Sequence, residues 1–164
     1  MMQSSAGSAH GTPSTESGLP VEVFEVLRKS DRAANPVVTV ATVDLDGSPH
    51  TAPFGSLRAI SPQILRFGCD RRHTTYSNIL RHGRVVVNLL HPPSIAVSIS
   101  GRANVTKERM VVSETDAVIE VQVQEVKDDS ISGIAFSIES GITLAYPADL
   151  RSAIEQYVAE VEQD

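Results

Sequence analysis

The sequence predicts a mainly β fold, a barrel of about six antiparallel strands with short helices at its periphery. Runs of β-branched or alternating apolar residues recur along the chain, and hairpin signals separate most of them. Helical spacing appears between the third and fourth strands and near each end of the chain. Because closing an antiparallel sheet of this size into a barrel removes its aggregation-prone edges, we expect a barrel.

Length and charge bound the class of protein. The chain has 164 residues and a net charge of -6, which suits one domain and repels nucleic acid and anionic membranes. The single cysteine, Cys69, fits a reducing compartment, and no apolar run approaches the roughly 20 residues of a membrane span. We therefore expect a cytoplasmic protein that binds neither nucleic acid nor membranes. Residues 1–18, rich in Ser, Gly and Thr, should be a disordered tail, and residues 19–164 a single domain.

A helix and a hairpin open the domain. Apolar residues within 20–29 recur at helical spacing. Residues 37–44 are dense in Val and Thr and strongly strand-like, and Asp46-Gly47 then signals a tight turn. The return strand, residues 48–59, contains Pro49, Pro53 and Gly55. Since proline donates no ladder hydrogen bond, this strand is an edge, or it is bulged, or its backbone is exposed to something that approaches it.

The middle of the chain is predicted to form a strand, a connecting segment over residues 70–75 (here called the elbow), a short helix and a further strand. Residues 63–69 form the first of these strands. After the elbow, Tyr76, Ile79 and Leu80 share a helix face, and Gly83 stands where a C-terminal cap is expected. Residues 84–90 form a continuous apolar strand interrupted by Asn88.

The elbow has an unusual charge for a helix start. Acidic residues are favoured in the first turn, where unpaired N–H groups and the helix dipole attract negative charge. After Asp70, however, the chain continues with Arg71, Arg72, His73, Thr74 and Thr75. A bound anion, most naturally a phosphate, would supply the missing negative charge. The alternative is that Asp70 caps the helix and the arginines are solvated.

The C-terminal half contributes two further strands and a helix. Residues 95–105 and 119–124 alternate between apolar and polar residues, as half-buried strands do. Residues 133–136 and 142–146 are weaker strand candidates, and residues 110–112 remain undecided. After Pro147 a last helix places on one face Leu150, Ile154, Tyr157, Val158 and Val161. This face should pack on the barrel or on a partner subunit.

Several short motifs occur together in a characteristic order. They are Val40-Ala41-Thr42-Val43-Asp44 followed by Gly47 and Pro49, then Tyr76-Ser77-Asn78-Ile79, then Gly83-Arg84-Val85, and finally Gly101. Over roughly residues 36–101 this order resembles the pyridoxamine 5'-phosphate oxidase-like, FMN-binding split-barrel family. The resemblance implies a six-stranded, Greek-key split barrel that binds FMN.

The resemblance also implies which residues meet the cofactor. Contacts to the isoalloxazine ring would fall on Ala52, Pro53, Phe54, Gly55, Phe67 and Gly68, with Cys69 as a small residue at the strand end near the flavin. Phosphate contacts would fall on His73, Thr74 and Thr75, with charge from Arg71 or Arg72. Such proteins are typically homodimers with two flavins between the subunits. Residues 94–101 or the last helix of the partner would then complete each site.

The chain departs from the true oxidases of that family. They carry a lysine at the position of Leu57 and an Arg-x-His near the C-terminus, and this chain has neither. We therefore reject pyridoxamine phosphate as its substrate and expect an FMN-dependent oxidoreductase of another, unknown substrate. Since no residue is an obvious acid or base, no catalytic side chain is named. No metal site is expected either, because His73, His82 and His91 fall on an elbow, a helix end and a turn. The alternatives are a non-catalytic flavin-binding or sensor module, or the same barrel with haem or a deazaflavin.

An elbow rich in positive charge could also lower the pKa of the Cys69 thiol. A small residue packed at the strand end is the simpler interpretation.

Overall fold

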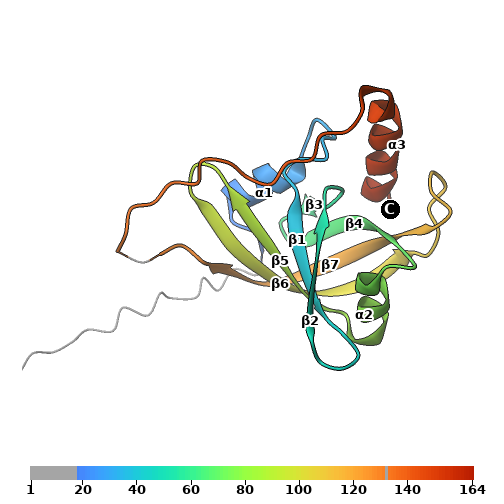
Figure 1. Cartoon of the computed structure of the whole chain (residues 1–164), viewed down its shortest axis with the longest axis horizontal. Helices are drawn as coiled ribbons and strands as arrows, with labels where there is room; N and C mark the ends of the chain where they lie inside the picture. Colours follow the sequence, from blue (N-terminus) through green and yellow to red (C-terminus); the bar gives the residue numbers. More distant parts are fainter. Residues whose placement is uncertain (1–17, 132) are drawn as a thin grey trace, which may run out of the picture.

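The computed structural model describes residues 18–131 and 133–164, so that the predicted tail lies outside the described residues except for Gly18. The helices are α1 (Val21–Arg28), α2 (Thr74–His82) and α3 (Arg151–Glu162), with a 3-10 turn, η1 (Ala148–Leu150), before α3 (Figure 1). The strands are β1 (Val38–Val43), β2 (Pro49–Phe54), β3 (Arg58–Ser61), β4 (Ile64–Asp70), β5 (Arg84–His91), β6 (Ile95–Lys107) and β7 (Asp116–Asp128). None of the described helices is long and apolar enough to cross a membrane.

All strands belong to one antiparallel sheet in the order β2-β1-β5-β6-β7-β4-β3. Its two edge strands, β2 and β3, follow each other in the chain with only residues 55–57 between them. The sheet therefore curls until its edges meet at this junction, but within the described sheet the two edges do not pair. This confirms the mainly β, antiparallel split-barrel fold.

The return strand predicted over residues 48–59 is in fact two strands, which is why the sheet has seven strands rather than six. The chain leaves β1 at Gly55 and starts β3 at Arg58, where it pairs with β4 instead. β2 is an edge strand, which is one of the alternatives that its two prolines left open.

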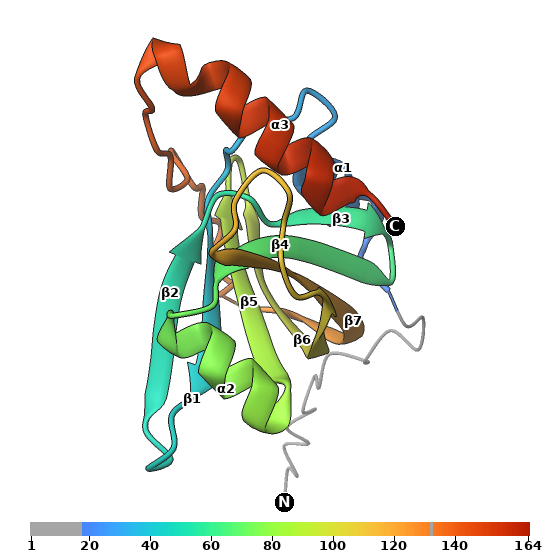
Figure 2. The same ribbon diagram turned by 90° about the vertical axis from the view of Figure 1, so that its right-hand side faces the viewer.

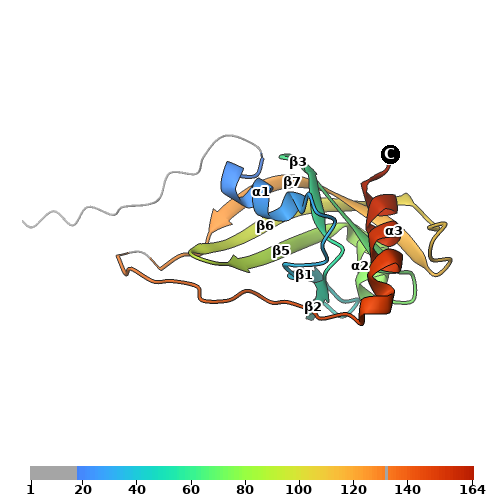
Figure 3. The same ribbon diagram turned by 90° about the horizontal axis from the view of Figure 1, so that it is seen from above.

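The segment after β7 differs from the prediction. Residues 133–147, here called the C-terminal strap, contain no helix or strand, so the candidate strands at 133–136 and 142–146 are wrong. The strap runs back along the molecule to reach α3 (Figures 1 and 3). It is fixed by the Asn35 side chain, whose Nδ2 donates to Leu144 O (3.0 Å) and whose Oδ1 accepts from Leu144 N (2.8 Å). The strap makes isolated backbone hydrogen bonds, from Val37 N to Ile142 O (2.9 Å) and from Ile138 N to Pro93 O (2.7 Å), and no continuous ladder.

The core and the last helix are packed in different ways. The barrel interior and α1 share one apolar cluster, which includes Leu27, Val40, Phe67 and Ile99. α3 lies on the side of β4 that also carries α2 (Figure 2). Its own cluster is small and contains Met110, Val118 and Val161, with Tyr157 at its border. Polar contacts must therefore supply much of what holds α3 in place.

Two buried cations fix the junction between the edge strands. The Arg58 side chain has no exposed surface. It donates to Ser56 O (3.2 Å), to Ala33 O (3.0 Å) and to Glu162 Oε1 (2.9 Å). Lys29 Nζ donates to Gly55 O (2.9 Å) and Ala34 O (3.3 Å). The carbonyls of residues 55 and 56 are thus held from inside the protein.

Arg58→Met should lower the free energy of unfolding by about 3 kcal/mol, because Glu162 and two backbone carbonyls lose their buried partner. The control is Arg28→Met, which removes an ion pair to Glu25 whose side chains are about half exposed and should change stability by about 0.5 kcal/mol or less. Urea denaturation of the three proteins measures both effects. Equal stability of Arg58→Met and the unmodified chain would contradict this role.

Lys29 should make stability depend on pH. Burial, and next the charge of Arg58, lower the pKa of Lys29 from 10.5 to about 7. Between these values the unfolded chain binds more protons than the folded chain, so the free energy of unfolding should rise with pH from about 7 to about 10. Denaturation series at several pH values should show a flatter dependence for Lys29→Met. The same slope in both proteins would refute the assignment.

Candidate functional site

The residues expected to meet a flavin ring lie on β2 and β4. Both strands are next to the gap between the unpaired edge strands β2 and β3, here called the split. On β2 the side chain of Ala52 is buried and that of Pro53 is exposed, with Phe54 between these extremes. On β4 the Phe67 side chain is fully buried in the core, where its ring centroid lies 4.7 Å from that of Phe54. Ala52 and Phe67 can therefore offer a ligand little beyond their backbone. Pro53, Phe54 and Gly55 form an accessible wall.

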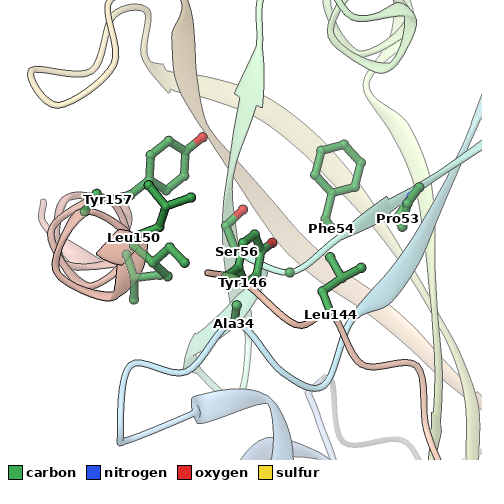
Figure 4. Close-up of a pocket in the computed structure, with 12 residues that line it drawn as sticks. Ala34, Pro53, Phe54, Ser56, Leu144, Tyr146, Leu150 and Tyr157 are labelled. Atoms are coloured by element: carbon green, nitrogen blue, oxygen red, sulfur yellow. The ribbon is translucent and has the colours of Figure 1, made fainter. Parts of the chain in front are cut away.

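That wall belongs to a cavity of about 400 Å³ between the split and the C-terminal segment (Figure 4). Pro53 and Phe54 approach it from β2, while Leu150 and Tyr157 approach it from the opposite wall. The barrel side also contributes Ala34, Gly55 and Ser56, and the C-terminal side Leu144, Tyr146, Ala153, Ile154 and Val158. None of these described lining residues is charged. Such a cavity suits a flat, apolar group with few hydrogen bonds.

Tyr157 closes the cavity toward β4. The phenol lies so near Gly68 that a Cβ atom there would stand 2.1 Å from Tyr157 Oη. Tyr157 Oη donates to Asp116 Oδ2 (2.6 Å), and burial, followed by this hydrogen bond, raises the pKa of Tyr157. The backbone of Gly68 is therefore covered by an aromatic ring of the same chain.

The sequence predicted part of this wall. The apolar face of the last helix predicted that Leu150, Tyr157 and Val158 would pack on the barrel or on a partner. In the structure they line the cavity of their own chain. Tyr146 and Leu144 were missed, because their position depends on the strap.

The elbow is capped differently from the expectation. His73, not Asp70, is the N-cap residue of α2, and its Nδ1 accepts from Thr75 N (3.2 Å). Asp70 instead forms an ion pair with Arg72, whose side chain is 77% exposed, and this contact lowers the pKa of Asp70. Arg71 donates to the carbonyl oxygens of Glu114 (2.9 Å) and Thr115 (3.3 Å). The two guanidinium groups are thus occupied separately and do not converge on one point.

Two buried polar atoms near the elbow have no partner among the described residues. They are His50 Nε2 and Thr75 Oγ1. The His50 ring lies 5.9 Å from that of His73, and His73 in turn binds the Thr75 amide. An unsatisfied buried polar atom costs about 1–3 kcal/mol, so such atoms commonly mark a place for a ligand or water. The start of α2 therefore has hydrogen-bonding capacity that the protein does not use.

Phe54 connects the elbow with the cavity. Its side chain lines the cavity, and its ring centroid is 6.2 Å from that of His73. The Phe54 side chain is therefore in contact range of both regions.

Cys69 is a packed residue and not a reactive thiol. Its side chain is buried, and burial, followed by the charges of Asp116 and Asp70, raises its pKa to about 12. The interpretation that the elbow lowers this pKa is wrong, because burial and the two carboxylates both raise it.

Gly68→Ala should displace Tyr157. The new methyl group would overlap the phenol, so we expect a loss of about 1–3 kcal/mol in stability and faster amide hydrogen exchange in residues 151–162. Adding Tyr157→Ala removes the clash, so the double variant should be more stable than the sum of the two single changes predicts. Unchanged exchange in Gly68→Ala would show that Tyr157 does not rest on this glycine.

Comparison with known proteins identifies a family whose sequence model matches this chain. The sequence model of the family described as pyridoxamine 5'-phosphate oxidase matches residues 24–141. No curated protein sequence matches the chain. The strap after residue 141 and all of α3, which supply most of one wall of the cavity, lie beyond the family match.

Solved structures show the same fold. A candidate pyridoxamine 5'-phosphate oxidase from Lactobacillus delbrueckii is 24% identical, with a TM-score of 0.58 over 69% of this chain and 96% of that chain. HupZ from Group A Streptococcus is 18% identical, with a TM-score of 0.54 over 77% of this chain and 99% of that one. A structure named F420 reductase is 16% identical, with a TM-score of 0.53 over 66% and 98% of the two chains. At these identities the likeness concerns the fold.

Proposed function

The chain belongs to the pyridoxamine 5'-phosphate oxidase family, and from that membership we propose that it is an FMN-binding flavoprotein, an oxidoreductase whose substrate is not pyridoxamine phosphate. One observation carries the proposal. Pro53, Phe54 and Gly55 line an uncharged cavity, and the Phe54 ring also lies beside the start of α2, where two buried polar atoms have no partner among the described residues. An aromatic ring with a phosphorylated tail matches that combination.

The ring and the phosphate of the cofactor would be bound in two different regions of the protein. The ring would lie against the backbone of residues 53–55 and face Tyr146. The phosphate would be held by the start of α2, through the Thr75 amide that now donates to His73 and the Thr75 hydroxyl that has no partner among the described residues. His73 and Thr74 would complete this site. Charge would come from Arg71 or Arg72 after a change of partner. The contacts expected at Gly68 and Cys69 are not part of this proposal, because Tyr157 covers Gly68 and the Cys69 side chain is buried.

The bound flavin would supply the redox chemistry, as cofactors generally do. The protein's own part is to exclude water with the apolar wall from α3 and to orient the ring. Of the described residues that line the cavity, none is an acid or base apart from Tyr146 and Tyr157. This poverty of proton-transfer groups favours, as the second candidate, a flavin-binding module without turnover.

A second copy of the chain is the expected partner. The outward positions of β1, β5 and β6 pair across the strands, Ala41 with Val86 and Val86 with Ser100. These positions are uncharged, and Val43, Val86 and Leu90 expose about 40% of their surface. Apart from Arg84 and Arg102 at its end, this exposed sheet face is uncharged, which is typical of a subunit interface. The flavoprotein would thus be a homodimer, in the reducing cytoplasm that a single buried cysteine suits.

Purified protein should be yellow, with absorption near that of free flavin, and heat should release FMN. Thr75→Val, which removes the hydroxyl but keeps its shape, should weaken FMN binding about tenfold and leave riboflavin binding unchanged, because riboflavin lacks the phosphate. Thr51→Val, at an exposed position of β2, is the matched control.

A colourless preparation that gives no signal on titration with FMN would overturn the proposal. A Soret band, or selective binding of a deazaflavin, would instead assign one of those cofactors to the same barrel. Equal effects of Thr75→Val on FMN and riboflavin would move the phosphate away from α2.

A further inference from the structure

Two arginines face each other on neighbouring strands. Arg84, the first residue of β5, is directly opposite Arg102 of β6 in the ladder. Both are exposed. Among the described residues, neither guanidinium group has a hydrogen-bond or ion-pair partner in the structure. Like charges directly opposite each other destabilise a sheet, so the pair is unfavourable unless something negative joins it.

The pair borders a broad, open hollow that carries neutral polar and apolar groups beside the two cations. The arginines line a cavity of about 570 Å³, together with Ser100 and Gln124. Ala41, Val43, Pro49 and Val86 supply its apolar part. The chain has 20 acidic residues, yet none of the described residues lining this cavity is acidic. The hydroxyl and amide groups add neutral hydrogen-bonding capacity beside the two cations.

The backbone under the pair is fixed. The pairing of β6 with β7 shifts between Ser100 and Gly101, as at a β-bulge. A Cβ atom at Gly101 would lie 2.6 Å from Gln122 O, so the strands approach closely here. Bulges of this kind redirect side chains and are common next to binding sites. Ser100 and Arg102, on either side of Gly101, are therefore held in a defined arrangement.

We infer that Arg84 and Arg102 form a binding site for a phosphate group carried by a small molecule with an apolar part. Two adjacent guanidinium groups offer paired donors that match phosphate oxygens. The elbow lacks such a pair, because Arg71 and Arg72 are engaged with Glu114, Thr115 and Asp70.

The phosphate has two possible sources. It belongs either to a free phosphorylated metabolite or to a flavin held by a second copy of the chain. The cavity adjoins the uncharged part of this sheet face through Ala41, Val86 and Ser100, so a subunit docked there would lie beside the arginines. The second source rests on the proposed function, and the first does not.

The test measures thermal unfolding with inorganic phosphate, at an ionic strength matched with chloride. The unmodified chain should gain several degrees in Tm at millimolar phosphate, because a ligand that binds the folded state stabilises it. Arg84→Gln and Arg102→Gln should each have a higher Tm without phosphate, since the repulsion is removed, and should lose more than half of the phosphate shift. Arg109→Gln, at an exposed arginine in another part of the chain, should behave like the unmodified chain.

Equal phosphate shifts in all four proteins, or no shift in the unmodified chain, would overturn the inference. Titration with FMN and riboflavin then separates the sources. If Arg102→Gln weakens FMN binding at least fivefold and spares riboflavin, the phosphate is that of the flavin. If it affects inorganic phosphate alone, the ligand is a separate phosphorylated molecule. Should no variant bind FMN, the proposed function fails while the phosphate shift still decides this site.

Discussion

The fully buried guanidinium group of Arg58 is the interaction on which the rest of the structure depends. A buried cation is stable only when acceptors surround it, and Arg58 takes them from three separate parts of the chain, at Ala33, Ser56 and Glu162. These contacts fasten the α1–β1 connection, the junction between the edge strands, and the end of α3 to one point. Lys29 adds a second clamp on Gly55 O. The backbone at the split between β2 and β3 is therefore held in place by buried hydrogen bonds.

This constraint positions the cavity. Residues 55 and 56 form its floor because Lys29 and Arg58 hold their carbonyls from inside. The opposite wall depends on the same arginine through Glu162, and also on Glu160, which accepts from the amides of Val111 and Val112 (2.6 and 2.9 Å) and pairs with Lys107. Since the apolar cluster beneath α3 is small, these polar contacts decide where Tyr157 lies. The wall is thus built largely from residues outside the family match.

The sequence predicted most of the features that depend on neighbouring residues. Alternation marked the strands, the prolines of β2 marked an edge, and the elbow between β4 and α2 lies where its pattern placed it. Long-range contacts stayed hidden. Asn35 and Leu144 are separated by 109 positions, and Arg58 and Glu162 by 104. No local pattern reports such pairs, so the strap and the cover over Gly68 were not predicted. The cap by His73 was also missed, because Asp70 is a good cap by type and its carboxylate went to Arg72 instead.

The central claim is that the split barrel and its C-terminal wall enclose a flavin. A crystal structure of the full chain grown with FMN tests it most directly. The account predicts the isoalloxazine ring against the backbone of residues 53–55 and the phosphate at the start of α2. A structure in which FMN is bound elsewhere, with Tyr157 on Gly68 and nothing in the cavity, would contradict it.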